Sequence, residues 1–226
     1  MNRKNTIPAA IMSVLLGTTA CTQAPKQPKV LMVDVDLSAS APPASDRPFA
    51  GRAANEVGKM IDGLSLGDTV VLTPIGESGF NSAQRLTFRL TPQMRQNAVA
   101  ARVGAIIAST PDSDLAGQQE TAITFAVENS GLRCNGEDRL VLITDGMESR
   151  RGFDRMEDVI EGKAELPKPP AGILKGCKVT MLGMGIAAKD RPQLTTEELR
   201  NLKAAWRGYF RAAGIADADI DIRTIF

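Results

Sequence analysis

Two apolar runs constrain the fold most, because neither shows the polar alternation of a strand that faces water on one side. They are Val30 to Val35, at the start of the stretch VLMVDVDLSAS, and Arg139 to Thr144, which contains LVLIT. Continuous apolar runs are typical of strands that helices cover on both faces, as in parallel sheets. With 226 residues, of which 43% are hydrophobic, the chain can build one such core.

Helical patterns alternate with β-rich runs along the chain, and this alternation predicts an α/β fold. We expect a doubly wound, mostly parallel six-stranded sheet with one antiparallel edge strand and helices on both faces. The edge strand is expected where apolar and polar residues alternate, at Gln84 to Leu90. The other strands are expected at Val30–Val35, Thr69–Pro74, Arg139–Thr144, Lys178–Met184 and Ile220–Ile225, and the helices at Phe49–Leu64, Pro92–Ala108, Thr121–Ser130 and from Thr195 to Gly214.

Two helix starts follow from local chemistry. Thr91 before Pro92 offers a capping oxygen next to a residue whose missing N–H costs nothing in a first turn. Thr195 and Glu198 match a capping box, and the apolar stripe that follows, through Trp206, is expected to be core.

The first residues have the composition of an export signal. Arg3 and Lys4 precede an apolar segment, Ile7 to Leu16, which is too short to span a bilayer and leads through small residues to Cys21. Gly17 to Cys21 resembles a bacterial lipoprotein cleavage site, after which Cys21 would be lipidated. Ordinary secretion and a retained anchor are the alternatives.

We therefore expect a signal peptide at residues 1–20, a lipidated cysteine and flexible polar tether at 21–29, and one domain at 30–226. The expected location is the cell envelope, as a periplasm-facing lipoprotein or a protein secreted to the periplasm. Without the leader, 25 Lys and Arg face 26 Asp and Glu, and a balance near neutral gives no support to nucleic acid as a partner.

Export bears on the two remaining cysteines, Cys134 and Cys177. In an oxidising compartment thiols tend to pair, and each of the two lies just before an expected parallel strand. A disulfide is therefore predicted, with two separate buried thiols as the alternative.

Polar side chains gather at the end of the first apolar run. Asp34, Asp36, Ser38 and Ser40 lie where the strand is expected to end, which is the usual ligand-binding edge of a parallel sheet. Buried carboxylates need a partner. Because the chain has no histidine, a hard divalent cation is the natural candidate.

These residues carry a family resemblance. Asp36-Leu37-Ser38-Ala39-Ser40 matches the DxSxS signature of von Willebrand factor type A domains, and Leu140 to Gly146 resembles the family's apolar strand that ends in Thr-Asp-Gly. Gly67 to Val70 resembles the entry into its second strand. The resemblance implies a metal-ion-dependent adhesion site, with ligands at Asp36, Ser38, Ser40, Thr121 and Asp145.

Such a site implies a Mg²⁺ ion, or Mn²⁺ or Ca²⁺, with one coordination position open to an acidic residue of a protein partner. Thr124 or Ser113 could replace Thr121, since the family's two glycines before that threonine are Gln119 and Glu120 here. The alternatives without a metal ion are that Ser38 and Ser40 cap a helix and that Asp145-Gly146 is a simple turn. Arg150 and Arg151 could flank the site or be solvated surface.

The expected function is a membrane-anchored binding module and not an enzyme. The alternative is a phosphatase of the haloacid dehalogenase type, because Val33-Asp34-Val35-Asp36 resembles that family's first motif, with Asp34 as nucleophile, Asp36 as general acid and Thr144 contacting phosphate. A metal-free scaffold is the third possibility.

Overall fold

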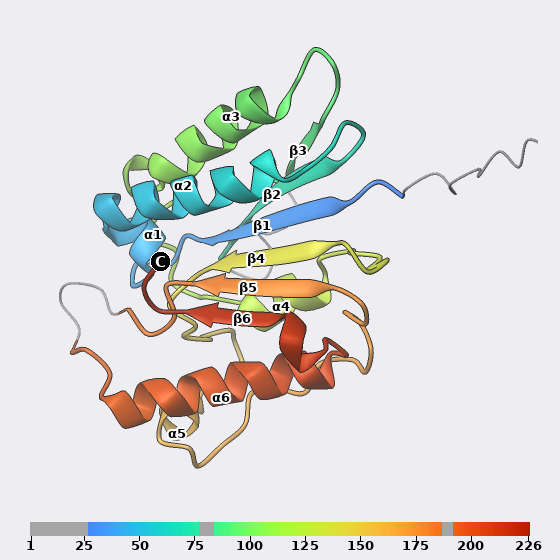
Figure 1. Ribbon diagram of the computed structural model, residues 1–226. Coiled ribbons are helices and arrows are strands. Elements are labelled where there is room, and N and C mark those ends of the chain that lie inside the picture. Colours follow the sequence, from blue (N-terminus) through green and yellow to red (C-terminus); the bar gives the residue numbers. More distant parts are fainter. Residues whose placement is uncertain (1–26, 77–83, 187–191) are drawn as a thin grey trace, which may run out of the picture.

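The computed structural model describes residues 27–76, 84–186 and 192–226, and within them the chain forms one six-stranded sheet between two layers of helices (Figure 1). The strand order is β3-β2-β1-β4-β5-β6, parallel throughout except for β3, which runs antiparallel to β2 at the edge. The strands are β1 Val30–Asp36, β2 Thr69–Ile75, β3 Leu86–Arg89, β4 Arg139–Ile143, β5 Lys178–Leu182 and β6 Ile220–Arg223.

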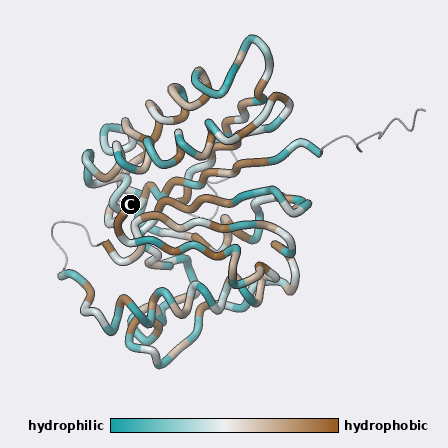
Figure 2. The backbone as a smooth tube through the Cα atoms, in the orientation of Figure 1, coloured by the Kyte–Doolittle hydropathy of each residue, from teal (hydrophilic) through white to brown (hydrophobic). Residues whose placement is uncertain are grey.

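Helices cover both faces of the sheet, as the apolar runs predict. Helices α2 and α3 lie on one face and α4, α5 and α6 on the other, and a separate apolar core fills each interface (Figure 1). The central strands are mainly hydrophobic (Figure 2). The helices are α1 Pro42–Ser45, α2 Arg47–Asp62, α3 Gln96–Ala108, α4 Ile123–Glu128, α5 Met156–Ile160 and α6 Thr196–Ala212, with short 3₁₀ helices at Thr110–Asp112 and Asp217–Asp219.

The architecture confirms the predicted fold class, but one of the two helix starts inferred from local chemistry is wrong. Helix α3 begins at Gln96, not at Pro92, and its N-cap Arg95 makes no side-chain cap. The Thr91 hydroxyl instead accepts a hydrogen bond from the Met94 N–H, 3.0 Å away, inside a turn. The capping box of Thr195 and Glu198 is present as predicted.

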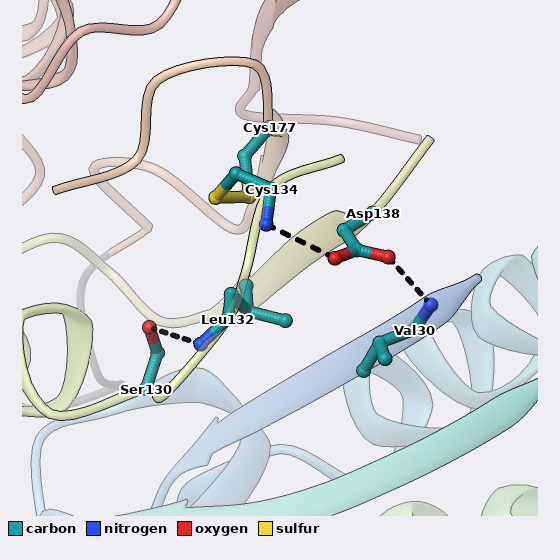
Figure 3. The surroundings of a disulfide bond; sticks show 6 residues. All are labelled: Val30, Ser130, Leu132, Cys134, Asp138 and Cys177. Atoms are coloured by element: carbon teal, nitrogen blue, oxygen red, sulfur yellow. Dashed lines mark hydrogen bonds between the residues drawn. A yellow bond between two sulfur atoms is a disulfide. The ribbon is translucent and has the colours of Figure 1, made fainter. Parts of the chain in front are cut away.

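The predicted disulfide joins Cys134 and Cys177 at the amino ends of β4 and β5 (Figure 3). Beside it, the buried Asp138 accepts hydrogen bonds from the N–H groups of Cys134 and Val30, at 3.1 and 2.8 Å (Figure 3). Asp68 accepts from Lys29 N in the same way, at 2.8 Å. Two carboxylates therefore fix the beginning of β1 to its neighbours.

The sheet order reverses between β1 and β4. The chain continues from β1 outward to β2 and β3, then returns to β4 on the other side of β1 and continues to β5 and β6. In open α/β sheets, the crevice beyond the carboxyl ends of two such strands is the usual place for a ligand. The ends of β1 and β4 are Asp36 and Ile143.

Candidate functional site

Asp36 is the centre of the polar cluster at this point of the sheet. Its carboxylate is fully buried and accepts two hydrogen bonds, from the Thr144 hydroxyl at 2.6 Å and from the Ser38 N–H at 2.9 Å. Thr144 can reach it because Val35 and Ile143, the residues before Asp36 and Thr144, are partners in the parallel register. No basic side chain forms an ion pair with Asp36 in the described part of the chain.

Burial raises the pKa of Asp36 to about 6, and the hydrogen bonds from Thr144 and Ser38 oppose this rise. A carboxylate in this position is short of positive charge, since desolvation disfavours its ionised form and no cation compensates it. The site is therefore electrostatically suited to a cation.

Ser38 and Ser40 follow in the turn after β1. The Ser38 hydroxyl is buried and has no hydrogen-bond partner within the described residues, while Ser40 is half-buried. The alternative that these serines cap the next helix is wrong, because α1 has Ala41 as its N-cap without a side-chain cap and α2 is capped by Asp46. Neither serine therefore caps a helix in the described structure.

Asp145 lies directly after Thr144, beyond the carboxyl end of β4. Its Oδ1 accepts a hydrogen bond from Met147 N at 2.8 Å, so part of this carboxylate does stabilise a local turn. The next residue, Gly146, has a φ of +82°, and a Cβ there would lie 2.6 Å from the Met184 sulfur. Its carbonyl accepts a hydrogen bond from the Trp206 indole N–H at 2.8 Å. This turn is thus fixed against α6, with Asp145 at the sheet edge.

Thr121 comes to the same end of the sheet from the segment before α4. Its N–H donates to the Ser149 hydroxyl at 2.8 Å, and its carbonyl accepts from Ser149 N at 2.9 Å. The next residue, Ala122, donates its N–H to the carbonyl of Gly76 at the end of β2. Thr121 itself is buried.

The two alternatives to Thr121 differ in availability. The Ser113 hydroxyl already accepts a hydrogen bond from Leu115 N at 3.2 Å. The Thr124 hydroxyl is buried without a hydrogen-bond partner within the described residues.

Glu148 is a buried residue of this region that the sequence did not reveal. Its carboxylate accepts hydrogen bonds from Thr124 N at 2.7 Å and from Arg150 N at 3.1 Å, which connects the loop after β4 to the first turn of α4. Burial raises the pKa of Glu148, against the effect of these donors. Nothing in the local sequence indicates this role, because it depends on how α4 packs.

The two flanking arginines differ. Arg150 is half-buried, whereas Arg151 is exposed and lies 3.8 Å from Glu120 in an ion pair. Only the latter fits the expectation of a solvated surface residue.

Asp34 is not part of the same cluster. It lies one pleat below Asp36 on the same face of β1, and its neighbours are Thr73 on β2 and Arg85. Burial raises the pKa of Asp34 to about 8, and the positive charge of Arg85 opposes this rise. Neither carboxylate oxygen has a hydrogen-bond partner among the described residues.

Two negative findings concern the described residues alone. No three Asp, Glu or Cys side chains there lie close enough together to hold a metal ion by themselves, and the predicted ligand set contains only two carboxylates. None of the helices described is long and apolar enough to cross a membrane. The predicted signal peptide and Cys21 lie outside the described residues.

The strand order, with a cluster of aspartates and hydroxyls at its topological switch point, agrees with the α/β fold that the resemblance to von Willebrand A domains implies. The chain matches no protein-family model and no curated protein.

Similar solved structures include the conserved hypothetical protein BatB from Bacteroides thetaiotaomicron, with 17% identity and a TM-score of 0.44 over 88% of this chain and 91% of that one. The pilus adhesin SpaC from Lactobacillus rhamnosus GG gives 13% and 0.46 over 89% of this chain, which spans only 28% of the adhesin. An aerotolerance-related membrane protein from Bacteroides fragilis gives 18% and 0.42, over 86% and 90%. Similarity at this level assigns no function.

Proposed function

We propose that this chain is an exported, membrane-anchored binding module that engages an acidic residue of a protein partner through a divalent cation. The ligands would be Asp36, Ser38, Ser40, Thr121 and Asp145. The observation that carries the proposal is the buried carboxylate of Asp36 beside the unpartnered hydroxyl of Ser38, with no basic side chain paired to that carboxylate in the described structure.

The residues present fit such an ion. Mg²⁺ and Mn²⁺ prefer oxygen ligands, and Mg²⁺ usually binds to one or two carboxylates while it keeps several waters. Two carboxylates with several hydroxyls meet this preference without a cluster of three acidic groups. A bound cation would offer a coordination position to the partner's carboxylate.

The rest of the cluster positions the proposed ligands. Thr144 and the Ser38 N–H orient the Asp36 carboxylate, and the Met147 N–H orients that of Asp145. Groups that hydrogen-bond to ligating carboxylates typically change metal affinity by about 10–100-fold when removed. We assign Thr144 this positioning role.

Membrane attachment at Cys21 belongs to the same proposal. The disulfide supports export, because such bonds persist in oxidising compartments. Cys21→Ser should release the protein from the membrane fraction or block its processing. An unchanged mass and unchanged fractionation would contradict a lipid anchor.

The phosphatase alternative requires Asp34 and Asp36 to act on one substrate. The two carboxylates have different neighbours, Thr73 and Arg85 for the first and Thr144 and Ser38 for the second, which favours two separate roles. Hydrolysis of an aryl phosphate that is lost in Asp34→Asn would restore the alternative.

The decisive experiment is calorimetric titration of the exported domain with Mn²⁺ and Mg²⁺, followed by capture of partners from envelope extract with magnesium or with chelator. We expect Asp36→Ala to abolish metal binding and capture while the protein remains folded. Asp62→Ala, which removes an exposed aspartate at the end of α2, is the matched control and should change neither. Equal capture from all samples would replace this proposal with the metal-free scaffold.

A further inference from the structure

A second polar pocket lies between the sheet and helix α4, separate from the proposed metal site. It has a volume of about 270 Å³ and is lined by Asp34 and Thr73 from the sheet, by Arg85, by Asn129, and by apolar walls that include Met32 and Phe125. The strand residues are buried, whereas Arg85 and Asn129 are exposed and form its rim. The pocket is thus polar at its floor and at its entrance.

The floor contains three polar atoms without hydrogen-bond partners among the described residues. They are both carboxylate oxygens of Asp34 and the hydroxyl of Thr73, and the two residues are partners in the register of β1 and β2. A buried polar group without a hydrogen bond is costly, and buried carboxylates nearly always have a partner. A group that donates several hydrogen bonds at this point would satisfy all three atoms, and a primary ammonium has three donors.

The entrance of the pocket carries the positive charge of Arg85. Arg85 makes no ion pair with a carboxylate in the part of the chain that the structure describes. A simple cation approaching the pocket is repelled by Arg85, and a simple anion brings no hydrogen-bond donors for the oxygens of Asp34 and Thr73. A molecule with a positive group at one end and a negative group at the other is complementary to both.

We propose that this pocket binds a small zwitterion, with its ammonium group at Asp34 and Thr73 and its carboxylate at Arg85. The ligand is the size of an amino acid, because 270 Å³ is below the usual range for drug-sized ligands yet several times the roughly 30 Å³ of one water. Met32 and Phe125 would contact its aliphatic part. This site requires no metal ion, and none of the proposed metal-coordinating residues lines the pocket.

The test is titration of the full domain with the series glycine, β-alanine, γ-aminobutyrate and ε-aminocaproate, monitored by calorimetry and thermal shift. We expect at least one member to bind and to raise the melting temperature. Butylamine and butyrate, each with one charge, should bind about tenfold more weakly or not at all, because butylamine is repelled by Arg85 and butyrate has no donors for the oxygens of Asp34 and Thr73. No response to any of the four zwitterions would overturn the proposal.

Variants separate the contributions. Asp34→Asn and Thr73→Val should weaken binding of the best zwitterion about tenfold or more, and Arg85→Gln should weaken the zwitterion but not butylamine. Asp36→Asn should leave this binding unchanged, so that failure here and failure of the metal proposal remain distinguishable. Circular dichroism confirms that each variant is folded.

Two outcomes would contradict the assignment directly. Undiminished binding to a folded Asp34→Asn variant would exclude the floor as the ammonium site. Equal binding of N-acetyl-lysine methylamide, which has an ammonium but no carboxylate, would indicate a lysine side chain of a protein as the ligand and not a free zwitterion.

Discussion

Ser38 can be tested without disturbing the core. Its buried hydroxyl has no partner within the described residues, so Ser38→Ala removes an unsatisfied group and should leave the free energy of unfolding unchanged or raise it by about 1 kcal/mol. The same change should lower Mn²⁺ affinity about tenfold or more, because a proposed ligand is lost. Denaturant unfolding and calorimetry measure the two effects.

Ser65→Ala, at an exposed position before β2, is the control and should change neither quantity. A Ser38→Ala protein that binds metal normally would remove Ser38 from the ligand set.

The burial of the Glu148 carboxyl group predicts that the free energy of unfolding depends on pH. Burial raises its pKa in the folded state, so the folded protein holds this proton more tightly than the unfolded chain does. The contribution of Glu148 to stability is therefore greatest below its unfolded pKa and is lost as the pH rises through its folded pKa.

The measurement is the difference in unfolding free energy between wild type and Glu148→Gln, taken from about pH 4 to pH 8. We expect the wild type to lose stability relative to the variant as the pH rises. A difference that is constant or grows in favour of wild type would show that the Thr124 and Arg150 N–H groups outweigh desolvation.

The sequence located some site residues better than others. Asp36 and Asp145 could be placed at one sheet edge because each ends an apolar run, and parallel strands end at the same edge. The contact of Thr144 with Asp36 depends on strand register, which the runs do not specify. Glu148 depends on the packing of α4 and has no local signal.

At the scale of elements, the turn after β4 is the most constrained. Gly146→Ala should lower the unfolding free energy by about 2 kcal/mol or more, because its φ is +82° and the new Cβ would meet Met184 at 2.6 Å and the Trp206 nitrogen at 3.1 Å.

Gly152→Ala is the matched control. Its φ of +85° is nearly the same, but nothing lies within 4 Å of the new Cβ, so it should cost only the backbone strain, about 1 kcal/mol. Equal losses in chemical denaturation would mean that the close packing at Gly146 contributes nothing.

Element boundaries were predictable where a side chain fixes them. Thr195 with Glu198 places the start of α6, because both halves of the capping box form. Thr91 has the same chemistry, but its hydroxyl closes a turn on Met94 and the helix begins later. The short helices α1 and α5 have too few residues to show a helical period.

For the whole molecule, the disulfide should provide a large share of stability. Cys134 and Cys177 are 43 residues apart, and closing such a loop contributes about 4 kcal/mol in the chain-entropy model. The double variant Cys134→Ser, Cys177→Ser should unfold at a markedly lower denaturant concentration. Wild type under reducing conditions should unfold at the same lower denaturant concentration as the double variant. A loss of unfolding free energy well under about 1 kcal/mol would show that residual structure in the unfolded chain or strain in the bond cancels the effect.

Residues 27–29 lead into strand β1 at its amino end. The proposed metal ligands Asp36, Ser38 and Ser40 lie at its carboxyl end. It lies between β2 and β4, with its first residues held by Asp68 and Asp138 and its last by Thr144. If a partner bound at the cation is pulled against a membrane anchor, the part of the tension that enters through Ser38 and Ser40 runs along the covalent backbone of this one strand. The hydrogen bonds from β1 to β2 and β4 carry little of that force. They therefore need not break for the domain to transmit it.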